Sequence, residues 1–417
     1  MDSLQRAIDR ALGRLGVDRA EPIVVACSGG PDSSALAHAA MALARAGRLG
    51  PVTLCHVDHQ LRADSAADGL LVARLAADGG ADFASLVVDV DRRRASLESA
   101  ARDARYAALE RVAAGRKAAA VLVGHTLDDQ AETVLMRIIA GTGLGGLAGI
   151  PPRRGLFVRP LLECRRAETV DYCSRHGLTT ADDPTNLDLG HTRNRLRHSI
   201  LPVLRRENPR LDDALGELAA RAAEVDALVD RAADDLARTA RSSAGWDADA
   251  LAAAPRAVSA RALARAAAAA GAGPLSARHH AALDALVHRP AGGSAGLDLP
   301  GVRALREYGR VRFVAAGGDP PLPAAGVEVS GPDPPYEVRT VRPGDRMRPA
   351  RLRGRSRKLS DLFIDARVPR RLRAAARVVV RGSDGAIEWA EHIGPAHGSP
   401  VSVTLTGPDT LATNKSR

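Results

Sequence analysis

Short apolar runs alternate with alanine-rich stretches between residue 20 and about residue 200. The runs have the composition of short buried strands, and they are "PIVVACS", "VTLCHVD", "ASLVVDVD" and "AAVLVGH". The stretches between them are typical of helices, and they are "SSALAHAAMALARAG", "ADGLLVARLAADGG" and "LESAARDARYAALERVAAGR". This alternation predicts an α/β domain, a doubly wound parallel sheet with helices on both faces. We expect the domain to span residues 1–208 and to bind ligands beyond the carboxyl ends of its strands.

The pattern changes after residue 208. Apolar residues spaced 4-3-4-3 predict one long helix that packs against neighbouring helices through a narrow seam. The seam consists of Leu211, Leu215, Leu218, Ala222, Val225, Val229, Ala232 and Leu236. Further alanine-rich helices and a few short strands follow, so we expect a mainly helical middle domain over 209–316. The segment "AAGGDPPLPAAG" is typical of a linker. A small basic α+β domain is expected beyond it, over 327–417.

The composition narrows the class of protein. None of the apolar runs approaches the roughly 18 residues of a membrane helix, and the first residues predict an amphipathic helix rather than a secretion signal. We therefore expect a cytoplasmic protein without a membrane partner. The four cysteines are Cys27, Cys55, Cys164 and Cys173. They form no C-x-x-C pair, which argues against disulfides and against a zinc or iron–sulfur site.

The charge of the chain favours a polyanionic partner. Its formal net charge is +10, although abundant arginine and alanine with scarce lysine also indicate a mutational bias. The positions of the basic residues along the chain are more informative than the net charge. Between Arg339 and Arg373, thirteen basic residues stand against three acidic ones. A solvated basic face is the alternative, but we expect this segment to contact nucleic-acid phosphates.

The stretch "IVVACSGGPDSS" suggests an anion site where the first strand meets a helix. Adjacent glycines allow close backbone approach, and the helix start offers unpaired N–H groups that favour a phosphate. The alternative is a tight turn with a capping side chain. The loop lacks the Lys-Ser/Thr pair of nucleotide triphosphatases and the three glycines of the dinucleotide fingerprint. A donor-rich loop without its own cation suits a pyrophosphate that arrives with Mg²⁺, and Asp32 is the candidate to hold the metal.

A second candidate site lies in "VLVGHTLDDQAETVLMR". A strand ends near His125 and a helix begins around Asp128 and Asp129, which places Asp129 and Glu132 on one helix face. Helix capping is the alternative, but it needs only one acid. The two further acids, with an adjoining His and Gln, predict a site for Mg²⁺ or a substrate ammonium.

Two further segments carry polar clusters. In "LCHVDHQLR" we expect a polar rim around a nucleotide rather than a metal site, and we assign no catalytic role to Asp58. The residues of this rim are His56, Asp58, His59 and Arg62. "ADDPTNLDLGHTRNRLRHSILPVL" places an acidic loop before a basic helix with Arg193, Arg195 and Arg197. Arginine forks suit phosphate or carboxylate recognition, whereas a charged surface helix is the alternative.

Several of these motifs together resemble one family. "SGGPDS" is similar to the loop of the N-type ATP pyrophosphatase (PP-loop) superfamily. It is followed in order by "HVDHQLR", "ARDARY", "GHTLDDQAET", "RPLLECRRAE" and "DDPTN...TRNRLR". This order resembles the bacterial tRNA(Ile)-lysidine synthase family, as does the tail segment "RTVRPGDRMRPARLRGRSRKLSDLFIDARVPRRLR". From Ser383 onward the chain follows the family less clearly.

The resemblance implies an activity and its substrates. ATP would adenylate the C2 oxygen of cytidine 34 in the CAU anticodon of tRNA(Ile) and release pyrophosphate. The ε-amine of free L-lysine would then displace AMP and leave lysidine, which switches decoding to AUA. The resemblance implies ATP binding by Ser28, Gly29, Gly30, Pro31, Asp32 and Ser33. Asp32 would lie near Mg²⁺, and Asp129 and Glu132 would orient the lysine or a metal. The implied contacts to phosphates or tRNA are Arg102, Arg105, Arg193, Arg195, Arg346 and Lys358. The middle and C-terminal domains would bind the tRNA, and a homodimer is compatible with the sequence.

Other activities remain as alternatives. A PP-loop tRNA thiolase would need a thiolate carrier or an iron–sulfur cluster, and the chain has no paired cysteines for either. An amidotransferase would usually carry a glutaminase, and none is recognisable. A non-catalytic RNA-binding protein with a degenerate loop would bind RNA without turning over ATP.

Overall fold

The computed structural model describes residues 1–58, 65–88, 97–181, 188–290, 294–315, 326–332 and 335–406. The chain divides into two compact units, Met1–Leu228 and Val229–Arg417. The boundary falls inside the helix α10 (Leu211–Ala240), whereas the sequence predicted domain limits at residues 208 and 316. The predicted three-domain division stays a prediction.

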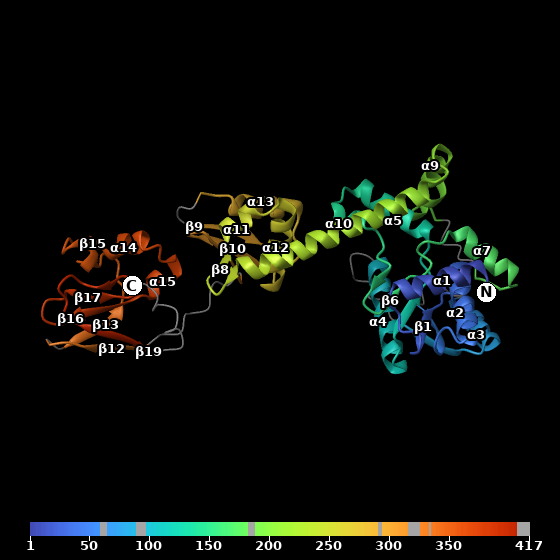
Figure 1. Cartoon of the computed structure of the whole chain (residues 1–417), viewed down its shortest axis with the longest axis horizontal. Helices are drawn as coiled ribbons and strands as arrows, with labels where there is room; N and C mark the ends of the chain where they lie inside the picture. Colours follow the sequence, from blue (N-terminus) through green and yellow to red (C-terminus); the bar gives the residue numbers. More distant parts are fainter. Residues whose placement is uncertain are drawn as a thin grey trace. The chain divides into compact units, whose positions relative to one another are not determined.

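The first unit is built on a six-stranded sheet with the order β3-β2-β1-β4-β6-β5. Figure 1 shows β1 and β6 of this sheet among the helices of the unit. The strands are β1 (Ile23–Ala26), β2 (Val52–Asp58), β3 (Asp82–Val87), β4 (Ala120–Val123), β5 (Arg153–Arg154) and β6 (Phe157–Val158). All neighbours are parallel except the hairpin of β5 and β6. The predicted doubly wound parallel sheet is confirmed. The chain leaves β1 toward β2 and returns to β4 on the other side, so the strand order reverses between β1 and β4.

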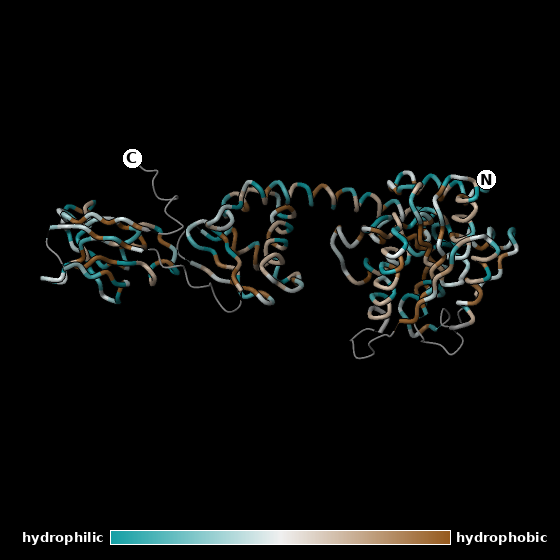
Figure 2. The backbone as a smooth tube through the Cα atoms, turned by 90° about the horizontal axis from the view of Figure 1, so that it is seen from below, coloured by the Kyte–Doolittle hydropathy of each residue, from teal (hydrophilic) through white to brown (hydrophobic). Residues whose placement is uncertain are grey.

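Alternate residues of β1 explain why its sequence is apolar throughout. Ile23 and Val25 pack into a cluster with the first helices, whereas Val24 faces Tyr106 and Leu109 on the opposite face. The helices of the first cluster are α1 (Ser3–Arg14), α2 (Pro31–Arg45), α3 (Ser65–Gly79) and α7 (Arg166–Arg175), and the opposite face is covered by α4 (Leu97–Arg116). Coloured by hydropathy, the backbone shows its most hydrophobic segments in the interior of this unit (Figure 2). A strand buried on both faces needs apolar residues at every position.

One predicted buried strand lies at the edge of the sheet instead. Among the described strands β3 pairs only with β2, and Val87 is 60% exposed. The run is apolar, but three of the six residues of β3 are exposed. The description of β3 as a buried strand is therefore wrong.

The long helix forms where the sequence predicts it, but its seam differs. α10 spans Leu211–Ala240 and packs against α5 (Leu127–Ala140) through Leu215 and Ala219, which contact Ala131 and Val134. Two predicted seam residues, Leu218 and Val225, are 40% and 42% exposed. The small Ala219 takes the contact position in place of Leu218, because it allows α5 to approach closely.

The second unit contains a five-stranded antiparallel sheet and a β-rich C-terminal part. The first sheet has the order β7-β8-β11-β10-β9 and packs on three helices. Its elements are β7 (Arg241–Ser242), β8 (Gly245–Asp247), α11 (Ala248–Ala253), α12 (Arg256–Ala269), α13 (Ala277–Val287), β9 (Ser294–Leu299), β10 (Val302–Glu307) and β11 (Arg310–Ala315). The predicted short strands thus join into a sheet beneath the helices.

The C-terminal part has the predicted α+β character. Its main sheet has the order β13-β16-β17-β18 and encloses a core around Phe363 and Val378. Its strands are β12 (Gly326–Ser330), β13 (Tyr336–Thr340), β14 (Arg346–Met347), β15 (Arg357–Lys358), β16 (Arg377–Arg381), β17 (Ile387–Ala390), β18 (Gly394–Pro395) and β19 (Ser402–Thr406). Its helices are α14 (Leu359–Asp365) and α15 (Arg370–Ala375).

Candidate active site

The predicted phosphate loop joins β1 to α2. Gly29 has φ +88°, a conformation that favours glycine, and Gly30 is the N-cap of α2. Pro31 follows at the first helical position, where its missing N–H is not needed. Ser33 Oγ donates to the Gly30 carbonyl at 3.0 Å and accepts from the Ser28 amide at 3.2 Å. The serines therefore fix the loop, while the first amides of α2 have no acceptor within their own helix.

The loop lies directly beside the end of β4. A Cβ atom on Gly124 would lie 3.2 Å from the carbonyl carbon and oxygen of Asp32 and from Ser33 Cα. This contact sits where the strand order reverses between β1 and β4, the usual place for a ligand in such sheets. The glycine after β4 thus lets the second candidate site approach the phosphate loop.

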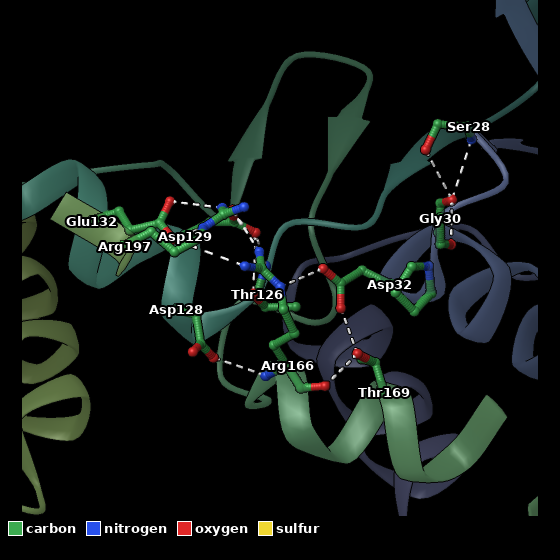
Figure 3. A network of polar contacts seen from close by, with 12 residues as sticks. Ser28, Gly30, Asp32, Thr126, Asp128, Asp129, Glu132, Arg166, Thr169 and Arg197 are labelled. Atoms are coloured by element: carbon green, nitrogen blue, oxygen red, sulfur yellow. Dashed lines mark hydrogen bonds and ion pairs between the residues drawn. The ribbon is translucent and has the colours of Figure 1, made fainter. Parts of the chain in front are cut away.

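Asp32 is held by the first turn of α7. Its Oδ2 atom accepts from Nε of Arg166 at 3.0 Å, and its Oδ1 atom accepts from the hydroxyl of Thr169 (Figure 3). Burial raises the pKa of the Asp32 carboxyl, while Arg166 and Thr169 act in the opposite direction. Each oxygen of Asp32 thus has a protein donor in this arrangement, and its role as a metal ligand stays a prediction.

Asp129 combines a capping role with ion pairing. Its Oδ2 atom accepts from the amide of Thr126 at 2.9 Å and from the Thr126 hydroxyl at 3.1 Å, which completes the N-cap of α5. Its Oδ1 atom accepts from Nη2 of Arg166 at 3.0 Å and from Nη2 of Arg193 at 2.9 Å. Burial alone would raise the pKa of Asp129, but Arg166 and Arg193 outweigh it and the pKa is lowered.

Glu132 lies one turn further along α5 and is 1% exposed. Its Oε1 atom accepts from Nε of Arg197 at 2.6 Å, and its Oε2 atom accepts from Nε of Arg193 at 2.7 Å and from Nη2 of Arg197 at 3.0 Å. The two acids thus share a face, as predicted, and three arginines neutralise them. An ammonium that enters here must replace one of these contacts.

Two of these arginines, Arg193 and Arg197, come from a helix with an irregular turn. α8 (Thr192–Arg195) continues through a π-helical turn at Leu196–Ile200 into α9 (Leu201–Glu207). The amide of Leu201 donates to the Leu196 carbonyl, five residues back. Pro202 explains the irregularity, because it has no N–H for the carbonyl four residues earlier. Arg205 of α9 then reaches Asp212 at 2.9 Å and Asp128 at 3.1 Å.

A second group of arginines surrounds Tyr106 and His125. Arg159 is 2% exposed and donates to the Tyr106 hydroxyl at 3.1 Å, and the Arg102 guanidinium lies 5.6 Å from the Tyr106 ring. Burial lowers the pKa of Arg105. Burial also lowers the pKa of His125 to about 4, with Arg159, Arg105 and Arg193 adding to the effect, so this imidazole is neutral at pH 7.

The other predicted contact residues lie in different surroundings. Arg195 braces its own loop by donating to the carbonyls of Leu189 at 2.9 Å and Gly190 at 2.7 Å. Arg346 and Lys358 are opposite each other in the hairpin of β14 and β15. Part of the basic excess serves local structure, since Arg339 forms two bonds of 2.8 and 2.9 Å to Asp345.

The predicted polar rim is described only in part. His56 is buried, with Nδ1 3.1 Å from the Cys27 carbonyl oxygen, and Asp58 is half-buried at the end of β2. His59 and Arg62 lie outside the described residues. Within the described ranges, no cluster of three or more His, Cys, Asp or Glu side chains is arranged to hold a metal ion. Over the same residues, no helix has the length and apolar character needed to cross a bilayer.

Sequence reasoning missed two residues of the site, Arg166 and Thr169. Both lie within or just after "RPLLECRRAE", a motif that carried the family resemblance without a residue role. The sequence indicated phosphate or carboxylate recognition for Arg197, and its partner is the carboxylate of Glu132, whereas His125 was noted beside the acids without a role of its own. An arginine at the start of a helix has no local signal that identifies its partners, because they are 134 and 37 residues away in sequence.

Three segments of the chain match known families. Residues 2–204 match the PP-loop domain, residues 247–312 match the TilS substrate binding domain, and residues 336–399 match the TilS substrate C-terminal domain. The matches therefore fall in the α/β part, in the sheet-and-helix part and in the C-terminal part.

Several curated proteins are similar over most of the chain. The tRNA(Ile)-lysidine synthase of Symbiobacterium thermophilum is 38% identical, covering 86% of this chain and 87% of that protein. The enzyme of the same name from Thermobifida fusca is 43% identical over 70% of this chain and 91% of that protein. Among solved structures, the U34-tRNA thiolase NcsA from Methanococcus maripaludis is 18% identical with a TM-score of 0.46, covering 53% of this chain and 78% of that one. The family matches and the long alignments to the curated enzymes together establish that the chain belongs to the tRNA(Ile)-lysidine synthase family.

Proposed function

We propose that this chain ligates free L-lysine to C2 of cytidine 34 in tRNA(Ile) with a CAU anticodon, at the expense of ATP. The observation that carries the proposal is the extent of the similarity. A shared PP-loop domain alone would fit other members of its superfamily, including a thiolase. The matches at residues 247–312 and 336–399 are to domains that bear the TilS name, so they favour lysidine formation over the alternatives.

In the first step the cytosine O2 atom attacks the α-phosphorus of ATP, and the bond to pyrophosphate breaks. Negative charge then develops on the departing pyrophosphate. The loop from Ser28 to Ser33 and the first amides of α2 are positioned to bind that charge, because they form the N-terminus of a helix. Mg²⁺ would enter with the triphosphate and neutralise part of its charge. The role of Asp32 as a metal ligand stays a prediction.

In the second step the ε-amine of lysine attacks C2, and the C2–O bond breaks to release AMP. We assign the orientation of the amine to the acids of α5, Asp129 and Glu132. Their negative charge is held in place by Arg166, Arg193 and Arg197. The amine must lose a proton to react, and a carboxylate in contact with it can accept that proton.

Binding of the RNA is assigned to basic residues other than the arginines that pair with Asp129 and Glu132. We propose that Arg102, Arg105, Arg195, Arg346 and Lys358 contact phosphates, whereas Arg193 chiefly positions the acids. Arg346 and Lys358 face each other across an antiparallel pair, an arrangement of like charges that is unfavourable without an anion nearby. A cytoplasmic location follows from a tRNA substrate, and a homodimer stays a prediction.

One assay tests the proposal directly. The purified chain is incubated with ATP, radiolabelled lysine and a CAU-anticodon tRNA(Ile) transcript, and label in RNA is measured together with AMP. We expect equal amounts of both, and no label in a transcript with U at position 34. Formation of ADP would exclude the ATP pyrophosphatase chemistry. Uptake of sulfur from a donor, with no uptake of lysine, would favour the thiolase, and RNA binding without AMP would favour the non-catalytic alternative.

A further inference from the structure

Arg166 connects the two halves of the candidate site. It is the first residue of α7, and its guanidinium lies between helices α2 and α5 (Figure 3). Its Nε atom is 3.0 Å from Oδ2 of Asp32, and its Nη2 atom is 3.0 Å from Oδ1 of Asp129. Its Nη1 atom is 3.9 Å from Oε1 of Glu132. One side chain therefore spans three carboxylates that belong to two different helices.

Such a group of carboxylates requires a cation. Asp129 and Glu132 are nearly inaccessible, and Asp32 joins them where the strand order reverses between β1 and β4. Buried like charges at short distance repel strongly, so a divalent metal or a basic side chain must compensate them. A guanidinium suits this position because its planar fork can bond two carboxylates at once and it keeps its charge when buried.

The position of Arg166 is fixed by its helix. The backbone amide of Arg166 donates to Oδ2 of Asp128 at 2.8 Å, which anchors the start of α7 to α5. One turn later Thr169 bonds Asp32, and Cys173 Sγ lies 3.4 Å from the Pro31 carbonyl oxygen. Contacts over two turns thus attach α7 to the start of α2. These contacts fix the backbone position from which the Arg166 side chain extends. The guanidinium is therefore positioned by α7 and not only by its bonds to the acids.

We infer that the guanidinium of Arg166 is the resident cation of Asp32 and Asp129, and that these carboxylates do not ligate Mg²⁺. The metal is then held by the nucleotide phosphates and water, without these two carboxylates. Asp32 becomes a positioning residue that acts through Arg166. The inference rests on the proposed function only in taking ATP as the nucleotide, and it departs from the sequence prediction that Asp32 holds the metal.

The arrangement also defines what Arg166 does for the two steps. It joins the helix that begins at the phosphate loop to the helix that carries the amine-site acids. A metal bound at the same place would leave with the product pyrophosphate, whereas a side chain stays. The acids therefore keep their geometry between release of pyrophosphate and attack of the amine.

The test uses Mn²⁺ as the probe, with free Mn²⁺ measured by electron paramagnetic resonance in titrations of the full-length chain. Without nucleotide, we expect the wild type and Asp32→Asn to bind Mn²⁺ equally weakly. With saturating ATP, Asp32→Asn should change the half-saturating Mn²⁺ concentration less than twofold. Asp171→Asn, an exposed acid on α7, is the matched control. A wild-type site that disappears in Asp32→Asn, or a tenfold weaker site in the ATP complex, overturns the inference.

A second variant tests the position of the cation itself. Arg166→Gln leaves Asp32 and Asp129 without their shared partner, so the nucleotide-free protein should gain a Mn²⁺ site at least tenfold tighter than any in the wild type. Adding Asp32→Asn to this variant should remove the gained site. Arg166→Lys keeps one charge and should bind Mn²⁺ more weakly than Arg166→Gln. Circular dichroism confirms folding of each variant, and folded Arg166→Gln with only wild-type binding contradicts the inference. These titrations need no lysidine formation, so they stand apart from the test of the proposed function.

Discussion

The Nε atom of Arg193 lies 2.7 Å from the Oε2 atom of Glu132, so an inaccessible carboxylate on α5 is bonded to an arginine 61 residues later in the chain. The bond belongs to the set that joins α5 to α8 and the π-helical turn. This bond implies that Glu132 stabilises the first unit, in addition to supplying negative charge to the candidate site.

Glu132→Gln should therefore destabilise the protein. The substitution keeps the volume of the side chain but removes one of the two buried carboxylates that Arg193 and Arg197 share, and Asp129 alone remains opposite them. Removing one member of a buried pair costs on the order of 3 kcal/mol. Thermal unfolding measures the loss. The control is Glu163→Gln, whose exposed pair with Arg14 should be worth less than about 1 kcal/mol. Equal losses of stability in the two variants would show that the buried ion pairs of Glu132 contribute no more than the exposed pair of Glu163.

The two glycines of the phosphate loop should respond differently to alanine. Gly29 has φ +88°, and a Cβ there would lie 3.4 Å from Ala181 Cβ, so Gly29→Ala strains the backbone by about 1–2 kcal/mol. Gly30 has φ −70°, and the nearest atom to its added Cβ is Ser28 Oγ at 3.8 Å. We expect Gly29→Ala to raise the KM for ATP at least tenfold and Gly30→Ala to raise it less. The KM of each variant for ATP is measured from the rate of AMP formation. A larger increase in Gly30→Ala than in Gly29→Ala would contradict the loop geometry.

His125 should make the protein sensitive to mild acid. Its pKa is about 4 in the folded chain, below the ordinary value of 6.5. Between these values the unfolded chain binds a proton that the folded chain does not, so stability falls as the pH drops from about 6.5 to 4. The full contribution is about 3 kcal/mol. Thermal unfolding between pH 4.5 and 7.5 measures it, and His125→Gln should show a shallower dependence. An unchanged slope would mean that His125 can take up its proton in the folded state.

Arg346→Gln should weaken tRNA binding in a salt-dependent way. If Arg346 contacts one phosphate, the slope of log affinity against log salt should become shallower by about one. The free protein should be nearly as stable as the wild type, since the Arg346 side chain is exposed and its two bonds to Ser356 are 3.3 Å long. Filter binding at several KCl concentrations provides the slope. Arg175→Gln, on the first unit, serves as the control and should leave the slope unchanged.

The sequence alone was sufficient to predict the strands and loops that have a strong local pattern of residues. β1, β2 and β4 are apolar runs that end in polar residues, and the loop from Ser28 to Ser33 has glycines where its backbone needs them. β5 and β6 have two residues each, too few for any periodicity. The seam of α10 failed at Leu218 because the partner helix, rather than the spacing alone, decides which face is covered.

The acids and the loops of the site were predicted from the sequence, but the ion pairs that join them were not. Asp129 and Glu132 were found from their spacing on one helix. Arg166 was not, because its role depends on α7 packing against α2 and α5, and no local pattern encodes that contact. Tertiary ion pairs of this kind bring together groups that carry no shared signal in the sequence.

The π-helical turn at Leu196–Ile200 sets the angular phase of the arginines around their helix. In an uninterrupted α-helix, the twelve positions from Arg193 to Arg205 would rotate the two side chains about 120° apart. The wider turn absorbs one extra residue, which reduces the offset to about 20° and lets Arg205 reach Asp128 from the same side as Arg193 reaches Glu132. Restoring a regular α-helical turn without a change of length would carry Arg205 about a third of a revolution away from its acids. The alignment of the two arginines should therefore depend on Pro202, which keeps this turn irregular.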